Sequence, residues 1–177
     1  MIQLVNDILQ LSHLDNVSET GAAPAMETVD LLDVARECVE RQKVNARHSY
    51  ISLTYLGESA PVTGSRVLLD ELCQNLCDNA IRYNRPGGKV QIITACTRDG
   101  HCTLTVKDNG IGIPKEAQTS VFERFYRVDK SRSKATGGTG LGLAIVKHIA
   151  RIHNARIKLD SVVDEGTTIT VIFETAS

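Results

Sequence analysis

The chain has 177 residues, of which 42% are hydrophobic, and this is enough for one folded domain with a substantial core. Its 20 Lys and Arg residues nearly balance 21 Asp and Glu residues, so the net charge of −1 argues against a chain that coats nucleic acid, and we expect no nucleic-acid partner. The sequence shows neither a signal peptide nor an apolar run long enough to span a bilayer, which favours a cytoplasmic domain.

The cysteines, at positions 38, 73, 77, 96 and 102, form no Cys-x-x-Cys pair and no cluster with histidine at zinc spacing. An odd number of cysteines without a motif indicates reduced thiols that pack as small apolar groups. We therefore predict neither a zinc site nor a redox site.

The first predicted element is a helix over residues 2–17, where apolar side chains recur at helical spacing. Its broad apolar stripe consists of Leu4, Ile8, Leu11 and Leu14, with Val5 and Leu9 alongside. The helical pattern starts without a capping signal, which is expected if these residues are the last part of a longer helix. Small residues over 18–28 then predict a linker, so that residues 29–177 form the main domain.

Helices and hairpins alternate in this main domain. Asp30 is placed to cap its first helix. The predicted helices cover 31–48, 65–84 and 139–154; a strand covers 50–56, and two hairpins pair 89–97 with 101–108 and 155–162 with 167–175. Hairpins in place of strict βαβ alternation predict an α+β fold, in which a mixed sheet has helices on one face, in two layers.

A glycine-rich stretch, GGTGLGLAIVKHI, has the form of a phosphate-binding loop that leads into a helix. Its glycines at Gly138, Gly140 and Gly142 do not follow a strand, as a dinucleotide-binding fingerprint requires. Leu143 and Ala144 stand where a P-loop needs Lys and Ser or Thr. Both common interpretations of such a loop therefore fail.

A second candidate is the stretch DNGIGIP, in which Asp108 ends an alternating strand and Gly110 and Gly112 follow. A carboxylate there can accept hydrogen bonds from an exocyclic amine such as that of adenine, and the glycines allow the ring to approach the backbone. A tight turn after a strand explains the same residues equally well.

A third candidate lies on the predicted helix 65–84, where Asn75 and Asn79 share one face. Amide oxygens suit Mg²⁺, Arg82 can meet phosphate, and Tyr83 can stack on a base. For any one of these side chains taken alone, the solvated face of an amphipathic helix is the better interpretation.

Together these blocks resemble the ATP-binding domain of sensor histidine kinases, which share a superfamily with type II topoisomerase, heat-shock 90 and mismatch-repair ATPases. The resemblance covers residues 27–175, with an N box at 75–83, glycine boxes at 108–112 and 138–143, and a phenylalanine box at 122–129. It implies a two-layer α/β sandwich of the Bergerat type, a mostly antiparallel sheet, and ATP and Mg²⁺ as cofactors.

The resemblance also implies a role for each matching residue of the N box. Asn79 would hold Mg²⁺, and Asn75 would support the phosphates from the preceding turn. Arg82 stands where the family often has Lys, which keeps the charge but changes the donor geometry. Tyr83 would lie against the adenine.

In the other boxes, Asp108 would accept the adenine amine, with Thr167 nearby on a late strand. Arg127 and Arg132 could reach the terminal phosphates, and the glycines would leave backbone N–H groups free for them. The ATP-binding residues expected from the resemblance are Asn75, Asn79, Arg82, Tyr83, Asp108, Gly110, Gly112, Ile113, Tyr126, Arg127, Arg132, Gly138, Thr139, Gly140, Leu141, Gly142, Leu143 and Thr167.

Residues 114–137 correspond to the flexible ATP lid of the family, with Phe122 and Phe125 as its apolar anchors. A plain solvated loop remains an alternative for this segment. The cations that such a loop would expose include Arg124, Arg127, Lys130, Arg132 and Lys134.

One position separates the enzyme classes within the superfamily. Hydrolytic members carry a water-activating Glu where this chain has Asn75, and an amide cannot act as a general base. Glu71 lies a further turn away, so intrinsic ATP hydrolysis should be slow, and transfer of the γ-phosphoryl group to a histidine is expected. His13 and the other histidines lack the pattern of the family's acceptor.

We therefore expect a protein-histidine kinase catalytic domain without its acceptor, with no catalytic residue inside the chain. Residues 1–17 would be the end of the dimerisation hairpin, whose histidine is supplied by the rest of a bacterial, membrane-anchored sensor that forms homodimers and signals to a response regulator. The chain by itself is expected to be monomeric. The alternatives are a non-catalytic nucleotide-binding module and a serine kinase of the anti-sigma type.

Overall fold

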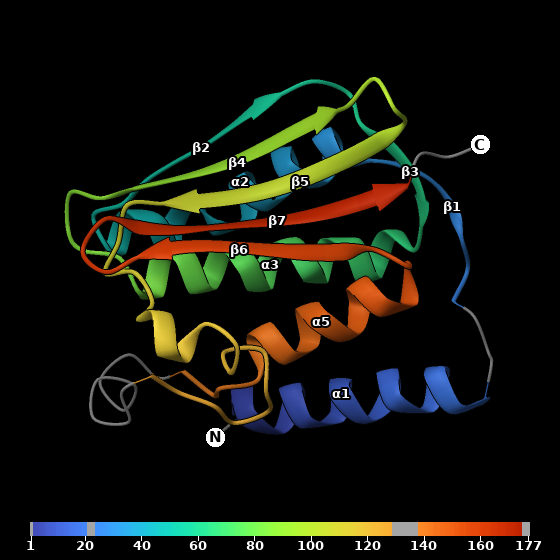
Figure 1. The fold of residues 1–177 in the computed structure, drawn as a ribbon, viewed down its shortest axis with the longest axis horizontal. Coiled ribbons are helices and arrows are strands. Elements are labelled where there is room, and N and C mark those ends of the chain that lie inside the picture. Colours follow the sequence, from blue (N-terminus) through green and yellow to red (C-terminus); the bar gives the residue numbers. More distant parts are fainter. Residues whose placement is uncertain (1, 21–23, 129–137, 175–177) are drawn as a thin grey trace.

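The computed structural model describes residues 2–20, 24–128 and 138–174. Figure 1 shows a twisted sheet with helices on one face, and one further helix outside them. The predicted two-layer α/β sandwich is therefore confirmed, and α1 (Ile2–Thr20) packs against its outer side.

The main sheet has five strands in the order β2-β4-β5-β7-β6. Only β2 and β4 pair in parallel, so the sheet is mixed and mostly antiparallel, and both predicted hairpins are present. A small second sheet pairs β1 with β3, neither of which the sequence patterns predicted. The strands are β1 (Glu27–Asp30), β2 (Ser52–Gly57), β3 (Pro61–Gly64), β4 (Lys89–Cys96), β5 (His101–Asp108), β6 (Arg156–Val162) and β7 (Gly166–Glu174).

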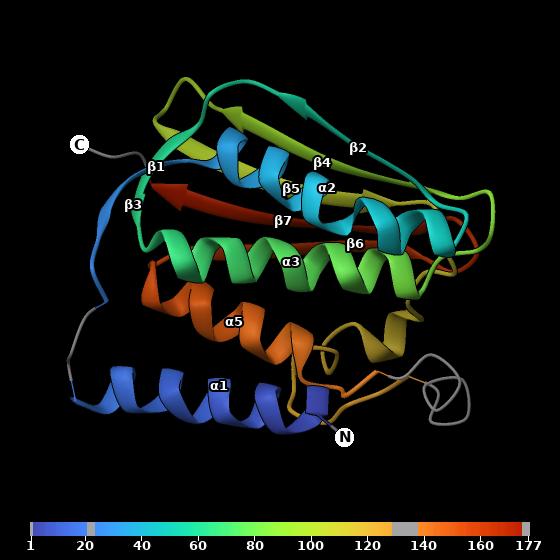
Figure 2. The same ribbon diagram turned by 180° about the vertical axis from the view of Figure 1, so that it is seen from behind.

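The helices α2 (Leu31–His48), α3 (Arg66–Arg82) and α5 (Gly142–Ile152) lie side by side on one face of this sheet, as Figure 2 shows. The predicted cap at Asp30 is confirmed, because its Oδ1 accepts a hydrogen bond of 3.0 Å from the backbone N of Leu32. A short 3₁₀ helix, η1 (Lys115–Ala117), follows β5.

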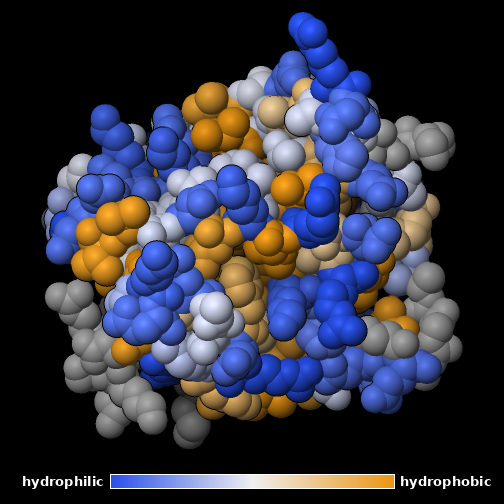
Figure 3. Space-filling view, in the orientation of Figure 1, coloured by the Kyte–Doolittle hydropathy of each residue, from blue (hydrophilic) through white to orange (hydrophobic). Residues whose placement is uncertain are grey.

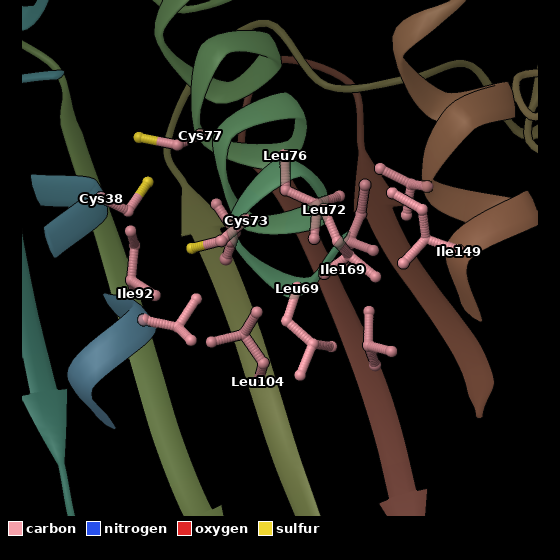
Figure 4. Packing of buried hydrophobic residues seen from close by; sticks show 14 of the residues in the cluster. Cys38, Leu69, Leu72, Cys73, Leu76, Cys77, Ile92, Leu104, Ile149 and Ile169 are labelled. Carbon is pink, nitrogen blue, oxygen red and sulfur yellow. The ribbon is translucent and has the colours of Figure 1, made fainter. Parts of the chain in front are cut away.

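The core lies between α3 and the strands, where Leu69, Leu72 and Leu76 of α3 meet Ile92 and Leu104 of the sheet (Figure 4). The spacing of three and four residues places these leucines on one helical face, which buries them together. Figure 4 also shows the three free cysteines at this interface. Cys38, Cys73 and Cys77 are buried, as expected of thiols that pack as small apolar groups.

The other two cysteines correct the sequence-based expectation of reduced thiols throughout. Cys96 and Cys102 form a disulfide, and their Cα atoms are 4.1 Å apart. They are register partners in the β4–β5 hairpin, and directly opposed residues of adjacent antiparallel strands approach this closely. The number and spacing of cysteines do not show which residues face each other across a hairpin, and the register of β4 and β5 decides this pair.

The helix α1 buries only part of its apolar stripe. Leu11 and Leu14 are buried, at 3% and 1% exposure, and α1 contacts α5. Asp7 is also buried, and its Oδ2 accepts a hydrogen bond of 2.7 Å from Thr139 Oγ1. Farther along, Asp15 accepts hydrogen bonds of 2.8 and 2.9 Å from Arg124. The helix thus contacts the segment that leads into α5.

The described surface carries its hydrophobic side chains in separate places. On the side shown in Figure 3, hydrophobic areas are bordered by hydrophilic residues. Exposed apolar residues include Tyr55 and Leu56 on β2 and Val162 and Val163 near the β6–β7 turn. In the part of the chain that the structure describes, no helix combines the length and the apolar character needed to cross a membrane.

A histidine ties the end of α5 to the start of α3, and it makes stability pH-dependent. The backbone N of Ser65 donates to His153 Nε2 at 3.0 Å, so the ring proton lies on Nδ1, 2.7 Å from the carbonyl oxygen of Ile149. Burial lowers the pKa of His153 from its usual value of 6.5, so the neutral ring is favoured in the folded state.

We expect the free energy of unfolding to be highest above about pH 6.5 and to fall at lower pH, by at most about 1.4 kcal/mol per pH unit from this group. Denaturant titrations between pH 7.5 and 5 check this prediction. His153→Gln should flatten the slope, whereas His48→Gln, at an exposed position of α2, should not. A slope that is identical in the wild type and in His153→Gln would contradict the assignment.

Candidate functional site

A cavity of about 770 Å³ lies between α3, the end of β5, the segment after η1 and the start of α5. It brings together nearly all the described residues of the predicted ATP site. Those that line it are Asn75, Asn79, Arg82, Tyr83, Asp108, Gly112, Ile113, Tyr126, Arg127, Gly138, Thr139, Gly140, Gly142, Leu143 and Thr167.

Three predicted site residues are not part of this lining. Gly110 is buried behind it, and its backbone N donates to Asp108 Oδ1 at 2.9 Å. Leu141 is fully buried and belongs to the hydrophobic core. These two residues therefore shape the site from behind its lining, and their part in ATP binding stays a prediction. Arg132 lies outside the described residues.

Asp108 and Thr167 form one end of the cavity. They are register partners on β5 and β7, and the backbone N of Thr167 donates to Asp108 Oδ1 at 3.2 Å. Burial raises the pKa of Asp108, while the backbone hydrogen bonds from Gly110 and Thr167 oppose this shift. Both bonds end on Oδ1, so Oδ2 carries neither of them and can accept from a ligand.

Gly112 is required beside this carboxylate. Its φ is +72°, and a β-carbon at this position would lie 2.2 Å from the carbonyl oxygen of Val162. Only glycine fits this close approach to the β6–β7 turn without strain. The backbone at Gly112 therefore carries no side chain beside the Asp108 carboxylate. This agrees with the prediction that the glycines allow a base to approach the backbone.

The helix α3 lines the opposite wall with its polar face. The Asn75 amide Nδ2 donates to the carbonyl oxygen of Glu71 at 3.0 Å, which leaves its Oδ1 as an acceptor. Asn79, one turn on, makes no hydrogen bond through its amide to any residue of the described part of the chain. Arg82 Nη2 lies 3.0 Å from Asp78 Oδ2. Glu71 is not among the residues that line the cavity.

The second glycine box closes this wall. A β-carbon at Gly138 would lie 3.0 Å from the Tyr83 hydroxyl oxygen, which places the segment directly over the end of α3. Gly140 has a φ of +76°, and a β-carbon there would lie 2.9 Å from Phe125 Cα. The first turn of α5 follows directly, and Gly142 and Leu143 of this turn line the cavity. The free backbone N–H groups of a helix lie in its first turn, so those of α5 are at the cavity.

The described part of the lid, up to residue 128, is held differently from the prediction. Phe122 packs against the core as expected. The Phe125 side chain is 57% exposed and is not an apolar anchor. Its backbone does the anchoring, since the N of Phe125 donates to the carbonyl oxygen of Gly140 at 2.9 Å. Among the apolar side chains of this segment, Val121 is buried in the hydrophobic core.

Sequence reasoning missed several polar residues at the site, among them residues on α1 and β6. Asp7 and Gln3 of α1 also line the cavity, although α1 was assigned to a different domain. Ser161 of β6 contacts Thr167 and Ile113 through its hydroxyl. No signal in the sequence singles out a serine within an alternating strand, because its role depends on which strands lie side by side.

A family model for histidine kinase-, DNA gyrase B- and HSP90-like ATPases matches residues 64–177, which include the whole cavity wall from α3 to β7. The chain belongs to this ATPase family. The recognition of the family from its boxes is confirmed.

Relatives of this ATPase are sensor kinases. The sensor-like histidine kinase SenX3 of Mycolicibacterium smegmatis is 44% identical over 176 residues, which cover 97% of this chain and 44% of the relative. The sensor protein kinase WalK of Staphylococcus saprophyticus is 38% identical over 170 residues, which cover 96% of this chain and 27% of the relative. The chain thus spans less than half the length of these relatives.

Solved structures agree with this assignment. The mycobacterial sensor histidine kinase MprB has 32% identity and a TM-score of 0.73, and the match covers 85% of this chain and 97% of that one. Full-length ShkA in complex with AMPPNP has a TM-score of 0.80 at 24% identity, covering 99% of this chain and 36% of that one, which shows the fold alone. The chain is the ATP-binding catalytic domain of a sensor histidine kinase.

Proposed function

We propose that this domain transfers the γ-phosphoryl group of ATP to a histidine on a dimerisation domain that the chain does not contain. The observation that supports this most is the convergence of Asp108, the paired amides of Asn75 and Asn79, and the second glycine box on one cavity. These groups suit, in turn, an adenine amine, a metal–phosphate unit and phosphate oxygens.

Magnesium fits the donor set on α3. Asn79 offers an amide oxygen free of other hydrogen bonds in the described chain, and Asn75 Oδ1 lies one turn before it. Mg²⁺ binds through one or two protein oxygens and keeps waters and phosphate oxygens as its other ligands, so this sparse set is sufficient. The bound ion would neutralise phosphate charge, while Asn79 would hold it and Arg82 and Arg127 would orient the phosphates.

The cavity favours transfer over hydrolysis. An amide at Asn75 cannot take a proton from water, and the Glu71 carboxyl is outside the cavity lining. Without a general base, a bound water is a poor nucleophile, whereas a neutral imidazole needs no deprotonation to attack phosphorus. The domain therefore positions ATP for an external histidine.

The helix α1 supports the proposed partner. Ile2, Val5 and Leu9 are exposed by 80%, 53% and 63%, although they lie on a helix that buries Leu11 and Leu14 and contacts α5. Such a face suits a second helix, so we propose residues 1–17 as the end of a dimerisation hairpin, 18–28 as its linker and 29–177 as the catalytic domain. The whole protein would then form a homodimer through this hairpin and signal to a response regulator. The domain would lie on the cytoplasmic side of a membrane-anchored sensor.

The test is a transfer assay with radiolabelled ATP and Mg²⁺. The chain alone should bind ATP but remain unlabelled, and a separately supplied histidine hairpin of a related sensor kinase should become labelled. Acid-labile, base-stable label on the hairpin is the expected result. A stable phosphohistidine on the chain alone, or ATP binding with no transfer to any hairpin, would contradict the proposal, and the second result would favour a non-catalytic nucleotide-binding module.

A further inference from the structure

Ser161 sits behind the cavity on β6 and makes three polar contacts through one hydroxyl. Its Oγ accepts a hydrogen bond of 2.8 Å from the backbone N of Ile113 and donates one of 3.0 Å to the carbonyl oxygen of Gly166. The third contact is 2.8 Å to Thr167 Oγ1, and here either oxygen could be the donor. The first two contacts settle the third.

A hydroxyl has one hydrogen and two lone pairs. The Gly166 carbonyl can only accept, so it takes the single hydrogen of Ser161, and the N–H of Ile113 occupies one lone pair. Thr167 must then donate its own hydrogen to the remaining lone pair of Ser161. The Thr167 oxygen is left with no hydrogen to offer to a ligand.

Thr167 lines the cavity, and so does its register partner Asp108. The two backbone hydrogen bonds to Asp108 both end on Oδ1, so Oδ2 is available as a second acceptor. The base end of the cavity therefore presents two acceptors, from neighbouring strands, and neither group supplies a donor.

We propose that Ser161 is a positioning residue that fixes the Thr167 hydroxyl as an acceptor, so that the cavity selects 6-aminopurine nucleotides over 6-oxopurine nucleotides. The inference rests on the proposed function and deepens it. An amine at position 6 has two N–H donors, one for each acceptor, whereas a 6-oxo group is itself an acceptor. A 6-oxopurine would leave the Asp108 and Thr167 acceptors unpaired and would place its own 6-oxo acceptor against them. A site built to accept hydrogen bonds from a ligand strongly rejects an analogue that lacks the donors.

The test compares the Kd values of ATP and ITP, which differ at position 6 and its adjoining ring nitrogen, by calorimetry with Mg²⁺. Wild type should prefer ATP. In Ser161→Ala the Thr167 hydrogen is free to rotate toward the ligand and donate to the 6-oxo group, so the ITP-to-ATP ratio of Kd values should fall about tenfold, as for one hydrogen bond. Ser161→Thr keeps the hydroxyl and should keep the wild-type ratio.

A second comparison shows whether Ser161 acts through Thr167. Thr167→Val should itself lower the ratio, and adding Ser161→Ala to it should change the ratio by less than about twofold, because the group that Ser161 orients is gone. A purely structural role of Ser161 would give the same shift in both backgrounds. Thr167→Val also provides the answer if Ser161→Ala does not fold.

The outcomes are distinct. ATP binding with an unchanged ratio in Ser161→Ala, or in Thr167→Val, overturns the inference and leaves the proposed function intact. A shift that is equal with and without the Thr167 hydroxyl overturns it as well. A folded wild type that binds neither nucleotide overturns both the proposed function and the inference.

Discussion

Replacing Asp108 with asparagine should weaken ATP binding by about 10- to 100-fold, the range expected for loss of one hydrogen bond to a charged acceptor. The amide oxygen can still accept the backbone N–H groups of Gly110 and Thr167 where Oδ1 does now. The amide nitrogen then replaces Oδ2 and turns a donor toward the donor of the adenine amine. Calorimetry with ATP and Mg²⁺ on the wild type and on Asp108→Asn measures the effect.

The matched control is Asp160→Asn, because Asp160 lies on β6 of the same sheet, faces solvent and does not line the cavity. It makes the same chemical change in the same sheet, and ATP affinity should stay at the wild-type value. Equal affinity for wild type and Asp108→Asn would remove the adenine assignment, and with it the orientation of the nucleotide in the cavity.

Replacing Asn79 with alanine should lower phosphoryl transfer to a supplied histidine hairpin by about 100-fold, the scale seen when one preorganised electrostatic contact to the reacting group is removed. The reason is that Asn79 is the proposed protein ligand of Mg²⁺. The amide is partly buried on α3 and needs no other partner for the fold, so the variant should keep its melting temperature. Single-turnover transfer rates over a range of Mg²⁺ concentrations measure the change.

Asn45→Ala is the control, since Asn45 is exposed on α2 and its amide nitrogen donates to Gln42 on the same helix. Its transfer rate should equal that of wild type. If Asn79→Ala transferred as fast as wild type at every Mg²⁺ concentration, Asn79 would not be the metal ligand. A loss that high Mg²⁺ restores would confirm that the amide acts through the ion.

The sequence by itself determined the local elements and the family. Apolar residues at helical spacing predicted α2, α3 and α5, alternation predicted both hairpins, and the place of Asp30 directly before a helix predicted its cap. These features depend on neighbours along the chain, so their signal is local. The boxes that line the cavity could also be found in the sequence, because they are short motifs with fixed residue types.

Only the tertiary structure decided what depends on residues far apart in the chain. The hairpin register joined Cys96 to Cys102, and the fold turned the Phe125 side chain outward while its backbone bonded to Gly140. The same holds for Ser161, which acquires its role when β6 and β7 place it beside Thr167. Hydrogen-bond polarity and close packing are set by partners across the sheet, and spacing along the sequence does not encode those partners.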